Sequence, residues 1–299
     1  MKKIVILGCE NSHADLFLSF IKANKKFSDV QVLGVYSEDK AAAESLKEKY
    51  GTPVMDTYDQ FVDEADGVIN TARHGDNHYK YVAPYLKKGI PMFIDKPITV
   101  SEGDALKLIS EAKHYGVKLT GGSCLRHDGF VQEIKRDVLN EVDGKTHGGL
   151  VRAPLSCNNP NGGFFFYVQH LVEMLMEAFG RYPKSVKAFK TNHPRKFEQG
   201  DDVTVVVRYD KYDIVALGGE LVFDYHISRC SDNKVKGFSF QVGYDRPCFF
   251  EEFDEFYDML NGAESTIGYK DFIAPVFVMN AIKKSLDSGK EVPVATYQI

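Results

Sequence analysis

The stretch Phe93-Ile94-Asp95-Lys96-Pro97 ends a short apolar run with an acid, a lysine and a proline. The apolar part has the composition of a buried strand, and the proline would stiffen the turn after it. In an open α/β sheet, small molecules bind in the crevice beyond the carboxyl ends of the strands. We therefore expect Lys96 to face a ligand and to take part in chemistry. The alternative is a lysine that simply reaches solvent.

Strands and helices alternate on both sides of this stretch. Short apolar runs predict strands at residues 3–7, 30–36, 53–54, 67–70, 91–94 and 118–121, and helical periodicity predicts helices at 14–23, 40–50, 59–64, 79–88 and 101–115. Such alternation is typical of a parallel, doubly wound α/β sheet with right-handed crossovers. The sequence therefore predicts a dinucleotide-binding Rossmann domain over residues 1–123.

The pattern changes after Cys124. Apolar and polar residues now alternate in the runs 149–155, 185–190, 203–209, 214–221, 222–229 and 238–242, with helices predicted at 130–139, 167–179, 248–261 and 269–286. Alternation of this kind indicates an antiparallel sheet with one face covered. We predict an α+β domain over residues 124–299 with a large, mostly antiparallel sheet, whose last helices pack on either domain.

Composition excludes several classes of function. The 299 residues carry 37 Lys and Arg against 42 Asp and Glu, a net charge of −5, so nucleic acid is not an expected partner. The apolar run before Gly8 is too short for a signal peptide, and no later run approaches the length of a membrane span. Five scattered cysteines indicate free thiols. We expect a soluble, cytoplasmic protein without a structural metal.

In their order and spacing, several local patterns resemble the glucose-fructose oxidoreductase, inositol dehydrogenase and MocA (Gfo/Idh/MocA) family across almost the whole chain. The strand-turn-helix opening is present. Asp95-Lys96-Pro97 stands where that family has Glu-Lys-Pro, and Leu125-Arg126 is similar to its Asn-x-Arg-Phe segment. The other matches are Gly162-Gly163 followed by His170, Asp201-Asp202 before an alternating strand, and the closing residues 289–293.

The resemblance implies an NAD(P)-dependent dehydrogenase that transfers hydride between a nicotinamide and a sugar, cyclitol or similar polyol. It implies Lys96 and His170 as catalytic residues that hold and move the hydroxyl proton. On an amphipathic helix alone, a histidine like His170 would more often be part of the core. The residues implied to bind substrate are these two together with Arg126, Asn158, Asn159 and Tyr167.

The resemblance also implies a cofactor site at the carboxyl ends of the first strands. Its predicted residues are Gly8, Cys9, Asn11, Ser12, His13, Ser37, Glu38, Thr71, His74, His78, Asp95 and Lys96. Glu38 and Asp39 would repel a 2′-phosphate and no arginine is near, so NAD is favoured over NADP. The loop residues His74, Asp76 and His78 would alternatively hold a metal ion, but no ligand spacing supports this, and no metal is predicted.

Two positions depart from the family. Glu10 replaces the second glycine of the phosphate loop, where its charge would repel pyrophosphate unless the side chain points away. In a shorter loop, Asn11, Ser12 and His13 would supply donors, or the Asn-Ser pair would simply cap the helix. Phe166 replaces the acid four residues before His170, so a carboxylate that would stabilise the imidazolium is missing there.

These departures leave two alternatives to a dehydrogenase. One is a Rossmann-fold binding or regulatory protein that has lost catalysis, and the other is an enzyme that cycles NAD within a lyase or hydrolase reaction. In either case we expect a homo-oligomer, dimer or tetramer, formed through the C-terminal sheet. The alternation of Val203, Val205 and Val207, with Leu217 and Leu221, leaves apolar surface to cover.

Overall fold

The computed structural model describes residues 1–191, 202–219 and 223–299. These residues form two compact units, one from residues 1–122, 249–273 and Ile299, the other from residues 123–248 and 274–298. The parts of the predicted runs that contain Asp201, Leu221 and Val222 lie outside the described residues. Within the described ranges, no helix has both the length and the apolar character that crossing a membrane requires.

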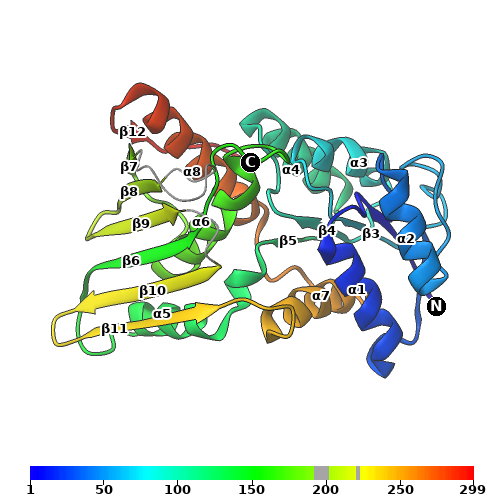
Figure 1. Ribbon diagram of the computed structural model, residues 1–299, viewed down its shortest axis with the longest axis horizontal. Helices are drawn as coiled ribbons and strands as arrows, with labels where there is room; N and C mark the ends of the chain where they lie inside the picture. The colour runs from blue at the N-terminus through cyan, green and yellow to red at the C-terminus, as the bar shows by residue number, and fades with distance from the viewer. Residues whose placement is uncertain (192–201, 220–222) are drawn as a thin grey trace. The chain divides into compact units, whose positions relative to one another are not determined.

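The first unit contains a parallel sheet of five strands in the order β2-β1-β3-β4-β5. Figure 1 labels β3, β4 and β5 of this sheet among the helices of the unit. Its strands β3, β4 and β5 are buried along their whole length, as expected for a parallel sheet with helices on both faces. The strands are β1 Lys2–Leu7, β2 Val30–Tyr36, β3 Gly67–Asn70, β4 Met92–Asp95 and β5 Leu119–Gly122; the helices between them are α1 Ser12–Ala23, α2 Lys40–Tyr50, α3 Asp76–Leu86 and α4 Glu102–Tyr115.

The predicted strand at residues 53–54 is reduced to one parallel bridge between Val54 and Val35. The bridge nevertheless extends the sheet beyond β2, so strand positions follow the chain order 3-2-1-4-5-6 of a Rossmann fold. The order reverses between β1 and β3, which places the switch point there. The helix predicted at 59–64 is wrong: the segment forms hydrogen-bonded turns instead, because so short a segment cannot offset the cost of helix nucleation.

Helix α7 (Pro247–Leu260) supplies part of the core of the first unit although it lies far along the chain. The Phe253 ring lies 5.2 Å from Phe17 of α1 and 4.8 Å from Phe27. Phe17, Phe27 and Phe253 are all fully buried, together with Phe256. Burial of each such ring stabilises the fold by about 1.5–3 kcal/mol, so residues 249–260 are an integral part of the first unit.

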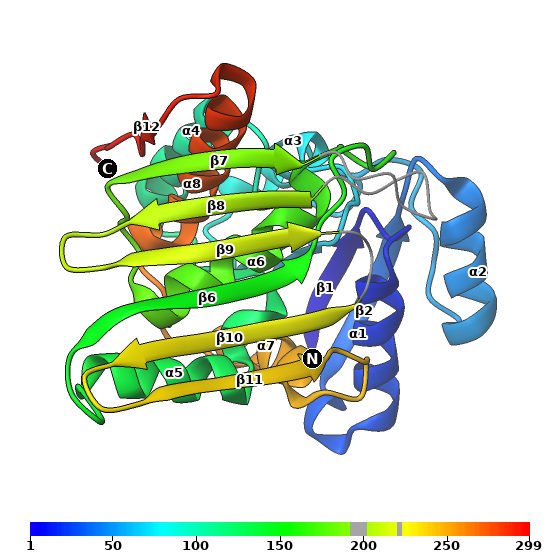
Figure 2. The same ribbon diagram turned by 60° about the vertical axis from the view of Figure 1, so that its left-hand side comes forward.

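The second unit contains a sheet of seven strands in the order β11-β10-β6-β9-β8-β7-β12. Its pairs are antiparallel except for β6 with β9, which confirms the predicted fold class. Helices α5, α6 and α8 lie along one face of the sheet (Figure 2). The strands are β6 Thr146–Pro154, β7 Ser185–Thr191, β8 Asp202–Arg208, β9 Asp213–Gly219, β10 Asp224–Ser231, β11 Val235–Gln241 and β12 Val292–Pro293; the helices are η2 Cys124–His127, α5 Gly129–Leu139, α6 Phe165–Phe179 and α8 Tyr269–Ser288.

The prediction of which β8 residues lie on the open face of the sheet is wrong by one position. Val203, Val205 and Val207 are at most 1% exposed and belong to the face covered by helices. The neighbouring Val206 pairs with Val215, and both are only partly buried. A shift of one residue in a strand exchanges its two faces. Leu217, by contrast, is partly exposed and lies on the open face as expected.

Candidate functional site

Gly8 directly follows β1 at the switch point and lies against Ala72, two residues beyond the end of β3. Its φ of +69° is a conformation that favours glycine, and a Cβ atom there would lie 2.2 Å from the Cα of Ala72. The Thr71 hydroxyl donates to the Gly8 carbonyl at 3.1 Å, and the Thr71 amide donates to Leu7. Two strand ends therefore meet closely through a residue without a side chain, as a phosphate-binding turn requires.

The loop that follows leaves the start of α1 without a side-chain cap. Asn11 occupies the N-cap position but makes no capping hydrogen bond. Its amide instead donates to Oδ2 of Asp95 at 3.0 Å, and the Ser12 hydroxyl donates to Asn11. The interpretation in which Asn11 simply caps the helix is therefore wrong. A helix start that is not capped in this way presents backbone N–H groups suited to an anion.

Asp95 ties this loop to the end of β4. The carboxylate is fully buried, accepts from the Lys96 amide at 2.7 Å and lies 3.0 Å from Nδ1 of His13. Burial alone would raise the pKa of Asp95, but the interactions with His13 and Lys96 outweigh it and hold the pKa below its ordinary value. The side chains of Asn11 and His13 are thus directed to Asp95, so any contacts of this loop with phosphate must come from other groups.

Replacing Asp95 with Asn is expected to destabilise the protein by about 3 kcal/mol at pH 7, because it leaves His13 and Asn11 without their buried carboxylate. The unfolded chain takes up the proton first as the pH falls, since the folded pKa lies below the ordinary 3.8. The stabilisation is therefore complete above pH 3.8 and is lost below it. Urea unfolding of both proteins from pH 7 to pH 3 measures this difference, and a difference that stays constant would contradict the account.

Glu10 reaches the ends of two strands on either side of β1. Its Oε2 accepts from the Ser37 hydroxyl at 2.7 Å, just beyond β2, and its Oε1 accepts from the Arg73 amide at 3.0 Å, beyond β3. Ser37 is buried, whereas Glu10 is half-buried. The carboxylate is therefore held by protein donors at a defined place, which its loop position alone did not indicate.

Glu38 and Asp39, which were expected to repel the 2′-phosphate of NADP, both interact with other groups of the protein. Glu38 pairs with Lys80 at 3.1 Å, and this pair lowers the pKa of Glu38. Asp39 accepts from the Ala42 amide at 3.2 Å and so caps α2. At the end of β2, Ser37 is bound to the carboxylate of Glu10.

His78 and His74 differ in exposure. His78 is fully buried, and its Nε2 lies 2.7 Å from the carbonyl oxygen of Ala72. A carbonyl only accepts, so Nε2 carries the proton, and burial lowers the pKa of this imidazole, which keeps it neutral. His78 therefore holds the turn after β3, whereas His74 is partly exposed, with its Nδ1 3.6 Å from Oδ2 of Asp76. Among the described residues, no three His, Cys, Asp or Glu side chains gather as metal ligands.

Cys9 follows Gly8 and is buried. Burial, with a smaller contribution from the nearby charge of Glu10, raises the pKa of its thiol to about 12. The thiol is therefore protonated at neutral pH and is not a nucleophile. Cys9 was predicted to bind the cofactor, but its side chain supplies no reactive group to the site.

In the second unit, His170 of α6 is bound to Ser123. Nδ1 of His170 lies 2.6 Å from Oγ of Ser123, whose backbone amide donates to Oε2 of Glu173 at 3.0 Å. Oε1 of Glu173 accepts from Gln169 at 2.7 Å, and burial raises the pKa of Glu173. A hydroxyl thus contacts the imidazole nitrogen, and Phe166, which replaces the expected acid, is buried.

The predicted substrate residues are spread over this unit. The Tyr167 ring lies 6.2 Å from the ring of His170. Arg126 lies in η2, the short helix that Ser123 caps, and is 7% exposed. Asn158 is exposed, and Asn159 accepts from the amide of Asn161 within the same loop at 2.9 Å. Sequence reasoning missed Ser123, which carries no local signal, and Glu173, whose place three residues after His170 on one helix face was such a signal.

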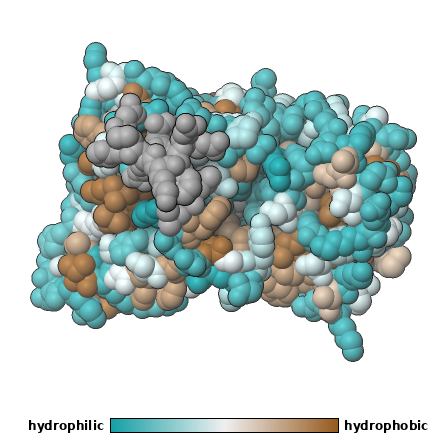
Figure 3. All heavy atoms as spheres, viewed as in Figure 1, coloured by the Kyte–Doolittle hydropathy of each residue, from teal (hydrophilic) through white to brown (hydrophobic). Residues whose placement is uncertain are grey.

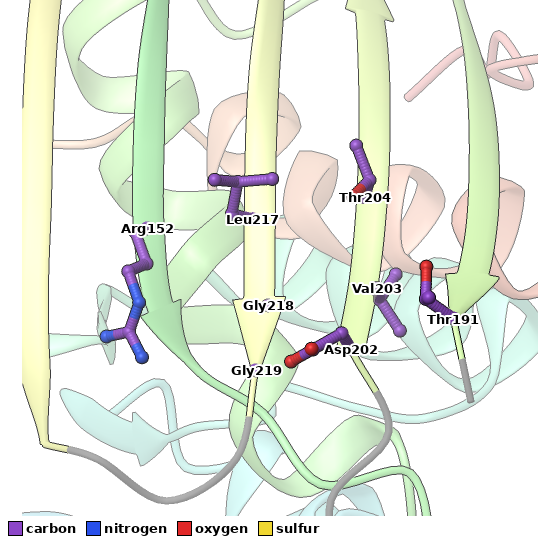
Figure 4. A pocket seen from close by; sticks show the side chains of 8 residues that line it. All are labelled: Arg152, Thr191, Asp202, Val203, Thr204, Leu217, Gly218 and Gly219. Atoms are coloured by element: carbon purple, nitrogen blue, oxygen red, sulfur yellow. The ribbon is translucent and has the colours of Figure 1, made fainter. Parts of the chain in front are cut away.

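A separate pocket of about 370 Å³ lies at the ends of β6, β8 and β9. Figure 4 shows Arg152 and Asp202 on either side of Gly218 and Gly219. The Arg152 guanidinium donates to the carbonyl of Asp224. The described lining residues include none of those predicted for cofactor or substrate: Arg152, Thr191, Asp202, Val203, Thr204, Leu217, Gly218 and Gly219.

Comparison with known proteins gives consistent matches. Residues 2–123 match a family model, Gfo/Idh/MocA, described as an oxidoreductase family with an NAD-binding Rossmann fold. Glucose-6-phosphate 3-dehydrogenase of Bacillus subtilis (strain 168) is 27% identical over 262 residues, which cover 81% of this chain and 72% of that protein.

Two solved structures illustrate the similarity of fold. A putative myo-inositol dehydrogenase from Sinorhizobium meliloti 1021 superposes with a TM-score of 0.82 at 16% identity, over 99% of this chain and 100% of that one. Scyllo-inositol dehydrogenase from Lactobacillus casei, solved with NAD(H) and scyllo-inositol, gives 0.83 at 15% identity over the same shares.

Proposed function

Because residues 2–123 match the model of the Gfo/Idh/MocA oxidoreductase family, we propose that the protein oxidises a secondary hydroxyl of a cyclitol, sugar or sugar phosphate, with NAD as hydride acceptor. The predictions of family, oxidoreductase activity and a nicotinamide cofactor are confirmed. The substrate class is inferred from the relatives, whose names specify inositols and glucose 6-phosphate. The observation that carries the proposal is the close approach of Gly8 to β3 at the switch point.

The residues of the first unit fit a dinucleotide. A side chain at position 8 would overlap the backbone of Ala72, and the start of α1 has no capping hydrogen bond from Asn11. Backbone N–H groups at such a turn suit pyrophosphate. When bound, NAD supplies the hydride acceptor. Gly8, Ser12, Thr71 and the ends of β2 and β4 are the groups that would hold it.

The catalytic roles follow from the resemblance and from the local surroundings of each residue. Lys96 is 5% exposed at the end of β4, next to the ionised Asp95. We assign to it the stabilisation of the substrate oxygen while its proton leaves. His170 receives that proton, and Ser123 fixes the orientation of its ring. Arg126, Asn158, Asn159 and Tyr167 are proposed to bind the hydroxyl groups of the substrate.

The division of labour is proposed to follow the chain. Residues 1–122 together with 249–273 form the cofactor unit, and the unit of residues 123–248 and 274–298 binds substrate and a second copy of the chain. The open face of the seven-stranded sheet carries Leu150, Val206, Val215 and Leu217, which are only partly buried. Figure 3 shows hydrophobic residues gathered over these strands. Covering them by another copy would yield a dimer or tetramer. The five free cysteines fit a reducing compartment, and the cytoplasm is our proposed location.

The proposed function is tested by incubating the protein with NAD and a panel of myo-inositol, scyllo-inositol, glucose and glucose 6-phosphate. We expect at least one of them to yield NADH, followed by absorbance at 340 nm. Substrate conversion without net NADH, seen by product analysis, would favour the redox-cycling alternative. NADH binding without conversion of any compound would favour the binding or regulatory alternative.

A further inference from the structure

We infer that Glu10 takes over the role of the acid at the end of β2: it binds the hydroxyl groups of the adenosine ribose and makes the chain selective for NAD over NADP. This inference rests on the proposed use of a nicotinamide cofactor. Glu10, the residue that departs most from the phosphate-loop pattern, would then be the residue that determines cofactor specificity.

The position of the carboxylate supports this role. In Rossmann folds, an acid at the end of the second strand accepts from the ribose 2′-hydroxyl. Here the residue beyond β2 is Ser37, and its hydroxyl donates to Glu10 Oε2 at 2.7 Å. A carboxylate therefore lies within one hydrogen bond of the place where the acid is expected, although it comes from the loop after β1.

Glu10 also keeps capacity for a ligand. A carboxylate offers about four acceptor positions, and the protein donors found on it are the Ser37 hydroxyl and the Arg73 amide. The residue is half-buried, so solvent reaches part of it. These two donors fix the carboxylate in place, and the remaining acceptor positions can receive the 2′- and 3′-hydroxyls of a ribose.

The other acids near β2 do not offer the same arrangement. Glu38 is paired with Lys80, and Asp39 accepts from the start of α2. The rival arrangement uses Arg73, which is exposed and would bind the 2′-phosphate of NADP. The Arg73 amide, however, is bound to the Glu10 carboxylate. A 2′-phosphate would therefore meet a negative charge at this place.

The test is titration of the purified full chain with NADH and with NADPH, followed by nicotinamide fluorescence. We expect the wild type to bind NADH at least tenfold more tightly than NADPH. Glu10→Gln is expected to weaken NADH binding about tenfold and to strengthen NADPH binding, so that most of the preference disappears. Glu44→Gln, an exposed glutamate on α2 that pairs with Lys47, serves as the matched control and should keep the wild-type ratio.

Several results would overturn the inference. If Glu10→Gln strengthened the binding of both cofactors by the same factor, Glu10 would be an obstacle to pyrophosphate. If Glu38→Gln abolished the preference and Glu10→Gln did not, Glu38 would be the ribose acid. A wild type that prefers NADPH, with this preference lost in Arg73→Ala, would establish the rival arrangement. If the wild type bound neither cofactor while its circular dichroism spectrum showed that it was folded, the proposed function itself would be refuted.

Discussion

Replacing Lys96 with Met is expected to lower the turnover number at least about 10³-fold. The reason is that Lys96 supplies the positive charge for the substrate oxygen from a position that is 5% exposed, where water cannot substitute for it. Loss of one such group typically costs 10²–10³ in rate, and without the cation beside the substrate oxygen the transfer of its proton to His170 also becomes less favourable. The rate of NADH formation at saturating substrate measures the effect.

Two further substitutions control this experiment. Lys107→Met removes an exposed lysine of α4 and is expected to leave the turnover number unchanged. Lys96→Arg keeps the charge but replaces a compact ammonium with a planar guanidinium, so we expect only partial recovery. A Lys96→Met protein that keeps more than about a tenth of the wild-type rate would remove Lys96 from the chemistry.

The second large effect is expected for Gly8→Ala. Alanine at a φ of +69° costs about 1–2 kcal/mol, and its Cβ would lie 2.2 Å from the backbone of Ala72, so the two strand ends must separate. Overpacking of this kind typically costs a further 1–3 kcal/mol. We therefore expect a total loss of about 3 kcal/mol in the free energy of unfolding, together with loss of NADH binding.

Gly51→Ala is the matched control for this substitution. Gly51 ends α2 with a φ of +74°, and nothing lies within 4 Å of the place where its Cβ would stand. Only the conformational cost of about 1–2 kcal/mol should appear. Urea unfolding of both variants isolates the close approach, and equal losses would show that β1 and β3 do not meet as described.

Local signals were sufficient for much of the fold. The helix predicted at 101–115 is confirmed as α4: Ser101 caps it by accepting from the Asp104 amide at 3.2 Å, and Gly116 ends it in the left-handed conformation. Such signals act within a few residues. The partners of α7 and the inward-facing side of β8 depend on contacts between distant segments. The sequence left open which domain α7 packs on, and the prediction for β8 was wrong.

In the candidate site, too, local motifs could be predicted and contacts between distant residues could not. Gly8, Lys96 and His170 stand in short motifs that fix their place in the fold, so the sequence could single them out. The role of Glu10 depends on Ser37 and Arg73, which lie 27 and 63 residues away. Ser123 lies 47 residues from His170. Pairings at such separations follow from the topology of the sheet and cannot be deduced from spacing along the chain.

The measurement that tests the central claim most directly is the mass of the NADH formed from a substrate deuterated at its ring carbons. The experiment uses the member of the inositol and glucose 6-phosphate panel that the protein converts. Direct hydride transfer predicts that the nicotinamide gains one deuterium, whatever the deuterium content of the solvent. Unlabelled cofactor alongside consumed substrate would contradict the account, because the hydrogen on the carbinol carbon would then not have been transferred to NAD.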